Sequence, residues 1–272
     1  MAELEGKVAI VTGSGRGIGK AVAKVFAREG AKVVVASRTP ATVEAVAQEI
    51  RDEGHTARGV PTDVSQKDQI LAMVATTVEH YGTVDILINN AANNPSPSEQ
   101  FELNERNFRL ENFPMEQWVN DLSIGLTGAF LCAKHYGNII SKNINGGSIV
   151  NISSDLGLIS PDQSLYRKDG LHEDQQPVKP ITYSVIKHGI IGMTKYLATY
   201  WADKGIRVNT ISPGGVYTNQ PDEFVSRISE LIPLGRMASE DEYKAAIVFL
   251  CSDASSYMTG SNLVIDGGRT CL

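Results

Sequence analysis

Two residues that could together move a proton, Tyr183 and Lys187, stand four positions apart in the sequence. Four residues make about one helical turn, so in a helix both side chains would point into the same space. A free phenol is a weak acid near neutral pH, with a pKa of about 10, and a neighbouring ammonium lowers that pKa. The pair could therefore exchange a proton with a hydroxyl or carbonyl oxygen, although many helices carry the same two residues on a solvated face.

A glycine-rich turn near the N-terminus could bind phosphate. Gly13-Ser14-Gly15-Arg16-Gly17-Ile18-Gly19 follows an apolar run at 7–12 and precedes a helical pattern at 20–30. In a strand–turn–helix unit, glycines let the backbone approach a pyrophosphate, and the helix N-terminus offers free N–H groups. The spacing is neither G-x-G-x-x-G nor that of a P-loop. A flexible surface loop is the alternative interpretation.

Apolar, β-rich runs recur along the chain, and helical patterns separate most of them. The runs are 7–12, 31–36, 56–60, 84–89, 147–153, 206–212 and 262–266. This alternation predicts an α/β domain with a doubly wound, mainly parallel seven-stranded sheet and helices on both faces. Two polar stretches, 93–113 and 160–180, are too long for ordinary connections, so we expect them to be functional loops.

Composition excludes several classes of protein. The 272 residues carry a net charge of −6 without a Lys/Arg cluster, so we expect no nucleic-acid partner. The sequence shows no signal peptide and no apolar run long enough to cross a membrane, so we expect a cytoplasmic protein without a membrane partner. The cysteines and histidines lack metal-ligand spacing, so we expect no metal site. Cys132 and Cys251 fall in apolar helical patterns and are expected to be buried free thiols.

Five short motifs follow one another along the chain. They are Thr12-Gly13-x-x-x-Gly17-Ile18-Gly19, Asn89-Asn90-Ala91, Ile152-Ser153-Ser154, Tyr183-x-x-x-Lys187 and Ser212-Pro213-Gly214. With this ordered set the chain resembles a short-chain dehydrogenase/reductase over nearly its whole length. The resemblance implies a single Rossmann-type NAD(P)-binding domain over 1–272, with substrate loops at 93–113 and 160–180. It also implies hydride transfer between a nicotinamide and a secondary alcohol or ketone.

The resemblance assigns a catalytic group to Ser154, Tyr183 and Lys187. Tyr183 would be the acid/base, and Lys187 its electrostatic partner, which also reaches the nicotinamide ribose. Ser154 would hold the substrate oxygen, with Ser153 as the neighbouring alternative. Ser154 precedes Tyr183 by 29 residues. This gap is longer than in most family members, so an insertion separates the two residues without needing to displace them.

One position departs from the pattern of the family. Counted from Trp118, Gly125 stands where the family has a catalytic asparagine, which helps to seat a water that links the lysine to solvent. Asn120 is a poor substitute because it lies five residues away. The departure puts that proton relay in doubt and leaves room for a non-catalytic relative.

The cofactor preference follows from the end of the second apolar run. Ser37-Arg38 stands there instead of the acidic residue that binds the ribose 2′-hydroxyl of NAD. Arg16 and Arg38 could hold a 2′-phosphate, so we favour NADP(H), with NAD(H) possible and two ordinary exposed arginines as the alternative. The cofactor contacts implied by the resemblance are Gly13, Ser14, Arg16, Gly17, Ile18, Gly19, Ser37, Arg38, Asp63, Val64, Asn90, Ala91, Tyr183, Lys187, Pro213, Gly214, Val216 and Thr218.

The inserted loop suggests the kind of substrate. It carries Arg167, Lys168, His172 and Lys179, and Tyr166 could stack on a sugar ring. We therefore expect an NADP-dependent oxidoreductase with a small, polar, sugar-like substrate. A solvated or subunit-packing loop, a 3-oxoacyl or other lipid-type reductase, and a non-catalytic NADP-binding regulatory protein are the alternatives.

Two further expectations rest on resemblance. The insertion, the run 89–94 and Gly125 together resemble short-chain dehydrogenases of bacterial surface-sugar synthesis, including the legionaminic acid pathway. The segment 257–268 usually packs at a subunit interface in the family. We therefore expect a homo-oligomer, either a tetramer or a dimer.

Overall fold

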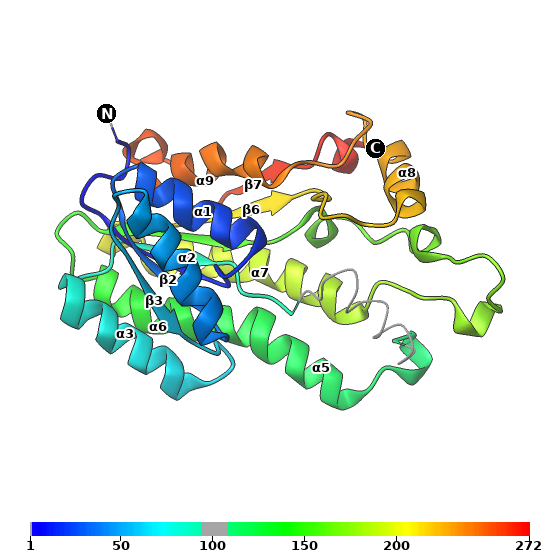
Figure 1. The fold of residues 1–272 in the computed structure, drawn as a ribbon, viewed down its shortest axis with the longest axis horizontal. Helices are drawn as coiled ribbons and strands as arrows, with labels where there is room; N and C mark the ends of the chain where they lie inside the picture. The colour runs from blue at the N-terminus through cyan, green and yellow to red at the C-terminus, as the bar shows by residue number, and fades with distance from the viewer. Residues whose placement is uncertain (1, 94–107) are drawn as a thin grey trace.

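The computed structural model describes residues 2–93 and 108–272 and has one seven-stranded sheet at its centre (Figure 1). Its strand order is β3-β2-β1-β4-β5-β6-β7, and every neighbouring pair is parallel. The strands are β1 (Val8–Thr12), β2 (Lys32–Ser37), β3 (Ala57–Pro61), β4 (Ile86–Asn89), β5 (Gly147–Ile152), β6 (Ile206–Pro213) and β7 (Asn262–Ile265). The predicted doubly wound α/β fold is confirmed, and each predicted run coincides with one strand.

Helices cover both faces of the sheet because the inner strands are apolar on both sides. On one face lie α1 (Gly17–Arg28), α2 (Pro40–Asp52) and α9 (Lys244–Cys251); on the other lie α3 (Lys67–Tyr81), α6 (Gly128–Ile140) and α7 (Ile181–Tyr200). Side chains alternate along β1, so Ala9 and Val11 pack with Phe26 while Ile10 packs with Tyr136. Cys132 and Cys251 are buried and free, as expected.

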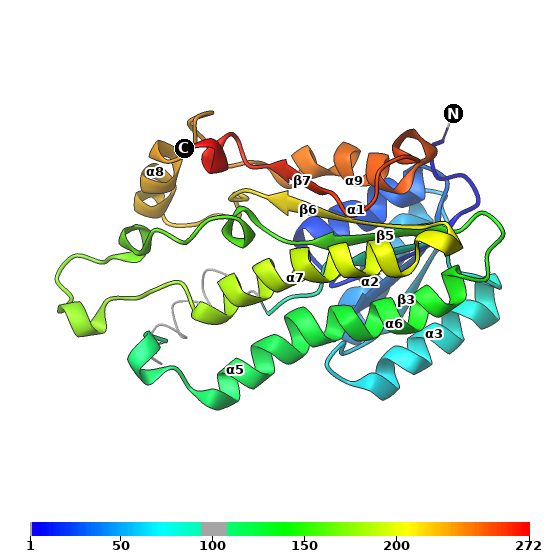
Figure 2. The same cartoon turned by 180° about the vertical axis from the view of Figure 1, so that it is seen from behind.

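The carboxyl ends of the strands meet at one edge of the sheet, where ligands of doubly wound proteins bind. The glycine turn follows β1, Asn90 follows β4, and Ser153 and Ser154 follow β5. Figures 1 and 2 show the segment between β5 and α7 extending beyond this edge, on the same side of the molecule as α8 (Asp222–Glu230). Short 3-10 turns at Asp155–Gly157, Gln163–Tyr166 and Glu173–Gln175 punctuate this segment.

Helix α5 (Met115–Leu122) runs into α6 through one π-helical turn, Ser123–Thr127. Of the predicted loop 93–113, residues 94–107 lie outside the described part of the chain. Among the helices that are described, none is long and apolar enough to span a membrane.

Candidate active site

The glycine turn has a backbone that side chains would block. Gly13 and Gly17 have positive φ angles of 65° and 55°, which L-residues rarely adopt. A Cβ built on Gly13 would lie 2.8 Å from Ala91 Cα, and one on Gly19 would lie 2.5 Å from Asn90 Nδ2. Glycine is therefore required for β1, α1 and the residues after β4 to approach this closely.

Asn90 and Thr12 fix the turn in place. The Asn90 amide donates hydrogen bonds to the carbonyls of Thr12 (3.0 Å) and Gly13 (3.1 Å). Thr12 Oγ1 donates to the Ile88 carbonyl and accepts from the backbone N–H groups of Asn90 and Ala91. The Ser14 hydroxyl is also occupied, because it donates to the Val11 carbonyl and accepts from the Ala36 N–H.

The ends of β1 and β2 carry the residues expected to choose between cofactors. Arg16 caps the N-terminus of α1 and Arg38 directly follows β2; both side chains are exposed, while Ser37 is half-buried. A Cβ on Gly15 would lie 2.8 Å from Ser37 Oγ. The turn thus packs directly against the end of β2, which carries Ser37 and Arg38 instead of an acidic residue.

The other predicted cofactor residues lie along the same edge. Asp63 Oδ1 accepts hydrogen bonds from the backbone N–H and hydroxyl of Ser65, and Val64 is buried against Gly128. After β6, Gly214 leaves no room for a side chain, since a Cβ would lie 2.7 Å from Asp266 Cα. The remaining residues of this group are Ile18, which packs against the core, Pro213, which ends β6, Val216, which forms a bridge with Ala238, and Thr218, which is exposed.

Strand β5 and helix α7 bring the three predicted catalytic residues together. Lys187 Nζ donates to the Ile152 carbonyl at 2.9 Å, and the Ser153 hydroxyl donates to the Lys187 carbonyl at 2.7 Å. Ser153 is therefore committed to holding α7 against β5. Ser154 is the serine that acts on Tyr183, because its hydroxyl lowers the pKa of the phenol against the effect of burial. This arrangement supports Ser154 over Ser153 as the substrate-binding serine.

An ion pair that the sequence did not suggest lies behind Ser154. The Ser154 hydroxyl donates to Asp155 Oδ1 at 2.7 Å, and Arg269 Nη1 lies 2.7 Å from Asp155 Oδ2. The Asp155 and Arg269 side chains are only 4% and 6% exposed. The C-terminal segment therefore neutralises a buried carboxylate that orients the serine.

Burial dominates the electrostatics of the site. It raises the pKa of Tyr183, and the hydrogen bond with Ser154 opposes that rise. Burial lowers the pKa of Lys187 to about 8, and the nearby charge of Lys179 adds to the effect. The expectation that Lys187 leaves Tyr183 with a lowered pKa is wrong for this structure, because burial is the largest effect on that pKa and raises it, while Ser154 provides the opposing effect.

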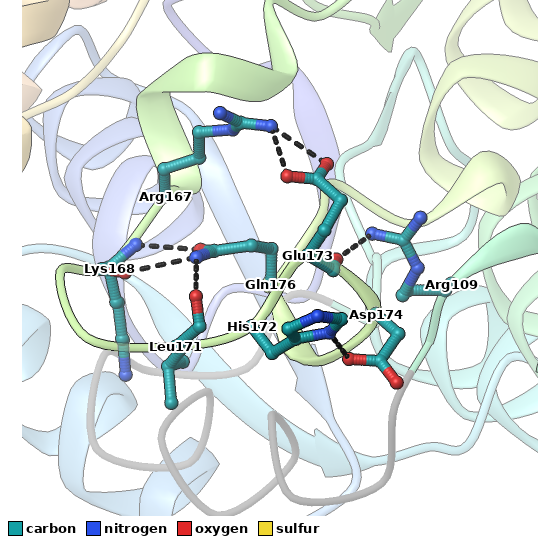
Figure 3. A network of polar contacts seen from close by, with 8 residues as sticks. All are labelled: Arg109, Arg167, Lys168, Leu171, His172, Glu173, Asp174 and Gln176. Carbon is teal, nitrogen blue, oxygen red and sulfur yellow. Dashed lines mark hydrogen bonds and ion pairs between the residues drawn. The ribbon is translucent and has the colours of Figure 1, made fainter.

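The segment between β5 and α7 is cross-linked internally (Figure 3). Arg167 Nη2 contacts both carboxylate oxygens of Glu173 at 2.6 and 2.7 Å, and Arg109 donates to the Glu173 carbonyl. The Gln176 side chain bonds the backbone of Lys168 and Leu171, while His172 Nδ1 lies 2.6 Å from Asp174 Oδ1. The charges of this segment thus largely order the segment itself.

Tyr166, which could stack on a sugar ring, packs against a neighbouring helix in the structure, and its hydroxyl lies close enough to Tyr183 for that residue to affect its pKa. The Tyr166 ring packs against Phe224 of α8, with 5.6 Å between centroids, beside Leu165 and Ile228. Burial raises the pKa of its hydroxyl. Tyr166 therefore anchors the segment to α8.

Gly125 lies in the π-helical turn between α5 and α6, where a side chain would meet α7. A Cβ built on Gly125 would lie 2.9 Å from Ile186 Cγ2. Ile186 is buried and directly precedes Lys187. Ile186 therefore occupies the space that a side chain at position 125 would need. The sequence showed the glycine but not this buried neighbour.

Family models match nearly the whole chain. Residues 7–167 match the model described as short chain dehydrogenase, and residues 172–270 match the one described as Enoyl-(Acyl carrier protein) reductase. The chain belongs to the short-chain dehydrogenase/reductase family, whose members are NAD(P)-dependent oxidoreductases. The predicted family and enzyme class are confirmed.

Named relatives cover almost all of the chain. Glucose 1-dehydrogenase 2 of Bacillus subtilis is 35% identical and matches over 98% of this chain and 96% of its own. The 3-oxoacyl-[acyl-carrier-protein] reductase of Synechocystis sp. is 33% identical over 98% of each chain. A crystal structure of a gluconate 5-dehydrogenase from Burkholderia cenocepacia, in complex with NADP and tartrate, has a TM-score of 0.83 at 28% identity and covers 99% of this chain and 97% of its own.

Proposed function

We propose that this enzyme uses NADP(H) to interconvert a secondary alcohol and a ketone on a polar, sugar-like substrate. One observation carries the proposal: the bond from Lys187 Nζ to the Ile152 carbonyl holds α7 at the carboxyl end of β5, so that Tyr183 and Lys187 lie beside Ser154, next to the polar segment that leads to α7. The sugar dehydrogenases among the relatives support the substrate class. The narrower resemblance to enzymes of surface-sugar synthesis stays a prediction.

Three residues have distinct roles in the proposed reaction. The bound nicotinamide supplies or accepts the hydride. Ser154 holds the substrate oxygen by a hydrogen bond, and Tyr183 donates a proton to that oxygen in reduction or removes it in oxidation. Lys187 places a cation 5.6 Å from the centre of the Tyr183 ring, where it stabilises a developing phenolate.

The residues around the glycine turn fit a dinucleotide. The turn excludes side chains from Gly13 and Gly19, so the backbone and the N-terminus of α1 can face a pyrophosphate. Arg16 and Arg38 provide positive charge, and Ser37 leaves space for a 2′-phosphate.

Substitutions at Ser37 and Arg38 test the proposed preference for NADP over NAD. We expect Ser37→Asp combined with Arg38→Leu to reverse the ratio of kcat/KM for NADP and NAD, because it adds repulsion and removes a contact. Arg38→Lys is the matched control, since it retains the charge. Equal kcat/KM values for both cofactors in the unmutated enzyme would refute the preference.

Two other functions compete with this proposal. A 3-oxoacyl reductase has support from the Synechocystis relative, but the β5–α7 segment is rich in charged groups rather than apolar. A non-catalytic NADP-binding protein has only Gly125 in its favour. Assays with polyols, aldoses, sugar acids, nucleotide sugars and an acetoacetyl thioester, each with NADP and NAD, separate the three. Turnover of the thioester alone would favour the reductase, and binding of NADP without any turnover would favour the regulatory protein.

A further inference from the structure

Lys179, expected to be one of several charges on the loop 160–180, lies at the proposed catalytic tyrosine, four residues before it. It precedes Pro180, the N-cap of α7, and its Nζ lies 4.0 Å from the centre of the Tyr183 ring. Its backbone N–H donates to Gln163 Oε1 at 2.8 Å, and Gln163 Nε2 reaches its carbonyl at 3.4 Å. The two ends of the polar segment therefore clasp each other and fix Lys179 beside the proposed proton donor.

The groups around the Lys179 ammonium do not, on balance, stabilise its positive charge. Within residues 2–93 and 108–272, no carboxylate forms an ion pair with Lys179. Asp155 is close enough to raise its pKa, but Arg269 and Ser154 already hold that carboxylate. The like charge of Lys187 is also close, since Lys179 lowers the pKa of Lys187.

Two further effects work against a cation here. Burial lowers the pKa of Lys179 to about 8, so its charge is held at a cost. The N-terminus of α7 is the positive end of the helix dipole, which disfavours cations. A ligand anion beside Lys179 would offset the repulsion from Lys187 and from the positive end of the α7 dipole.

We propose that Lys179 binds a carboxylate of the substrate, next to the carbon whose oxygen is held by Ser154 and Tyr183, so that the substrates are sugar acids. This inference rests on the proposed oxidoreductase function and narrows its substrate class. An ammonium at hydrogen-bonding distance from a carboxylate forms a charge-assisted bond, which is stronger than one between neutral groups.

The rest of the site favours a carboxylate over a phosphate. A phosphate dianion is commonly bound by several cations, frequently a bidentate guanidinium. Here Arg167 is committed to Glu173, Arg269 to Asp155, and Lys187 donates to the Ile152 carbonyl. Lys179 is then the one cation on the β5–α7 segment that the contacts place at the Tyr183 ring, and a single charge suits a carboxylate.

A second role for Lys179 must be separated from substrate binding. A cation over the phenol ring could act on Tyr183 alone, stabilising its phenolate whatever the substrate. In that case the loss of Lys179 would lower kcat equally for charged and neutral substrates. If Lys179 binds the substrate, the loss falls on the KM of carboxylates.

The test compares aldonates and uronates with neutral alditols and methyl glycosides of the same carbon number, and with alditol phosphates. The enzyme is assayed with NADP as wild type, Lys179→Met and Lys179→Arg. We expect wild type to prefer the carboxylates. Lys179→Met should raise their KM at least about tenfold, as expected for a lost charge-assisted bond, and leave neutral substrates unchanged, while Lys179→Arg keeps part of the preference.

Other outcomes overturn the inference. A wild-type preference for neutral or phosphorylated substrates would do so while the proposed oxidoreductase function stands. An equal loss on carboxylates and alditols in Lys179→Met would assign Lys179 to Tyr183 instead. Absence of turnover with every compound would contradict the proposed function. In that case, the change in melting temperature with the same compounds tests whether Lys179 binds a carboxylate. Stabilisation by carboxylates that is lost in Lys179→Met would support the inference, and the absence of such stabilisation would reject it.

Discussion

Ser154 is the residue that links the proposed acid/base, Tyr183, to the buried ion pair of Asp155 and Arg269. Its hydroxyl donates to Asp155 and shares a hydrogen bond with Tyr183 that lowers the pKa of the phenol, against the upward effect of burial. Asp155 is itself held by Arg269. In the proposed reaction the serine would thus both bind the substrate oxygen and lower the pKa of the acid/base.

This arrangement predicts a pH effect. Alcohol oxidation needs Tyr183 to accept a proton, so kcat should rise with pH until the pH passes the pKa of Tyr183. In Ser154→Ala the bond that lowers this pKa is gone, so the rising limb should move to higher pH, and kcat should fall roughly 10²-fold. Ser141→Ala, which removes a hydroxyl that donates to the Asn138 carbonyl at the end of α6, is the control. A rising limb at unchanged pH in Ser154→Ala would show that Ser154 does not tune the tyrosine.

Sequence reasoning reached some of these residues and missed others for a physical reason. Ser154, Tyr183 and Lys187 stand in short motifs, so their types and spacing could be read directly. Asp155 and Arg269 are 114 residues apart and meet only because the C-terminal turn folds back onto the end of β5. Lys179 looked like one of several loop charges, and only the start of α7 brings it to the Tyr183 ring.

Among the elements, the junction of α5, α6 and α7 departs most from the family pattern. The π-helical turn at Ser123–Thr127 is present, but Gly125 and Ile186 replace the asparagine with apolar contact. Pi turns often mark functional sites, and here the turn carries a glycine at the position where the family resemblance implies an asparagine. Water or another side chain must then complete any proton path from Lys187.

Substitutions at Gly125 and Ile186 should have non-additive effects on the free energy of unfolding. Gly125→Asn places its Cβ against Ile186 Cγ2, so it should lower the free energy of unfolding by about 1–3 kcal/mol. Ile186→Ala makes room, so the double variant should lose less than the sum of the two single variants. Urea unfolding of the four proteins measures this. Additive losses would mean that Gly125 and Ile186 do not compete for the same space.

The polar segment before α7 shows what a loop sequence can and cannot predict. Its length and polarity predicted a segment beside the active site, and the structure attaches its ends to the Ser154 and Tyr183 region. The individual roles differ, because Arg167 pairs with Glu173 and Tyr166 packs on Phe224. Side-chain partners within an irregular segment follow no period, so spacing could not reveal them.

For the molecule as a whole, sheet topology was the most predictable feature. Continuous apolar runs such as Val33–Ala36 are buried on both faces, and the helical patterns between them require parallel crossovers. Oligomeric state is less accessible to sequence, because exposed apolar residues are identified only when the fold is known. In the structure Val264 on edge strand β7, Phe249 on α9 and Tyr257 are exposed.

These residues, together with the family resemblance, predict a homo-oligomer that uses β7 and the segment 257–268 as an interface. Light scattering at micromolar concentration should give a multiple of 29.4 kDa. Val264→Lys should reduce the particle mass, because it places a charge in an apolar contact. Leu71→Lys, at a similarly exposed apolar site on α3, should leave the mass unchanged. A wild-type particle of 29.4 kDa would contradict the prediction.

The central claim is that Tyr183 exchanges the proton of the reaction, and Tyr183→Phe tests it most directly. The ring remains, so packing and cofactor binding should be preserved while the hydroxyl is lost. With the best substrate found, we predict that kcat falls by roughly 10²–10⁴-fold while the Kd for NADP stays nearly the same. A variant that keeps more than about a tenth of the wild-type kcat would contradict the account, since a general acid–base group contributes far more than tenfold.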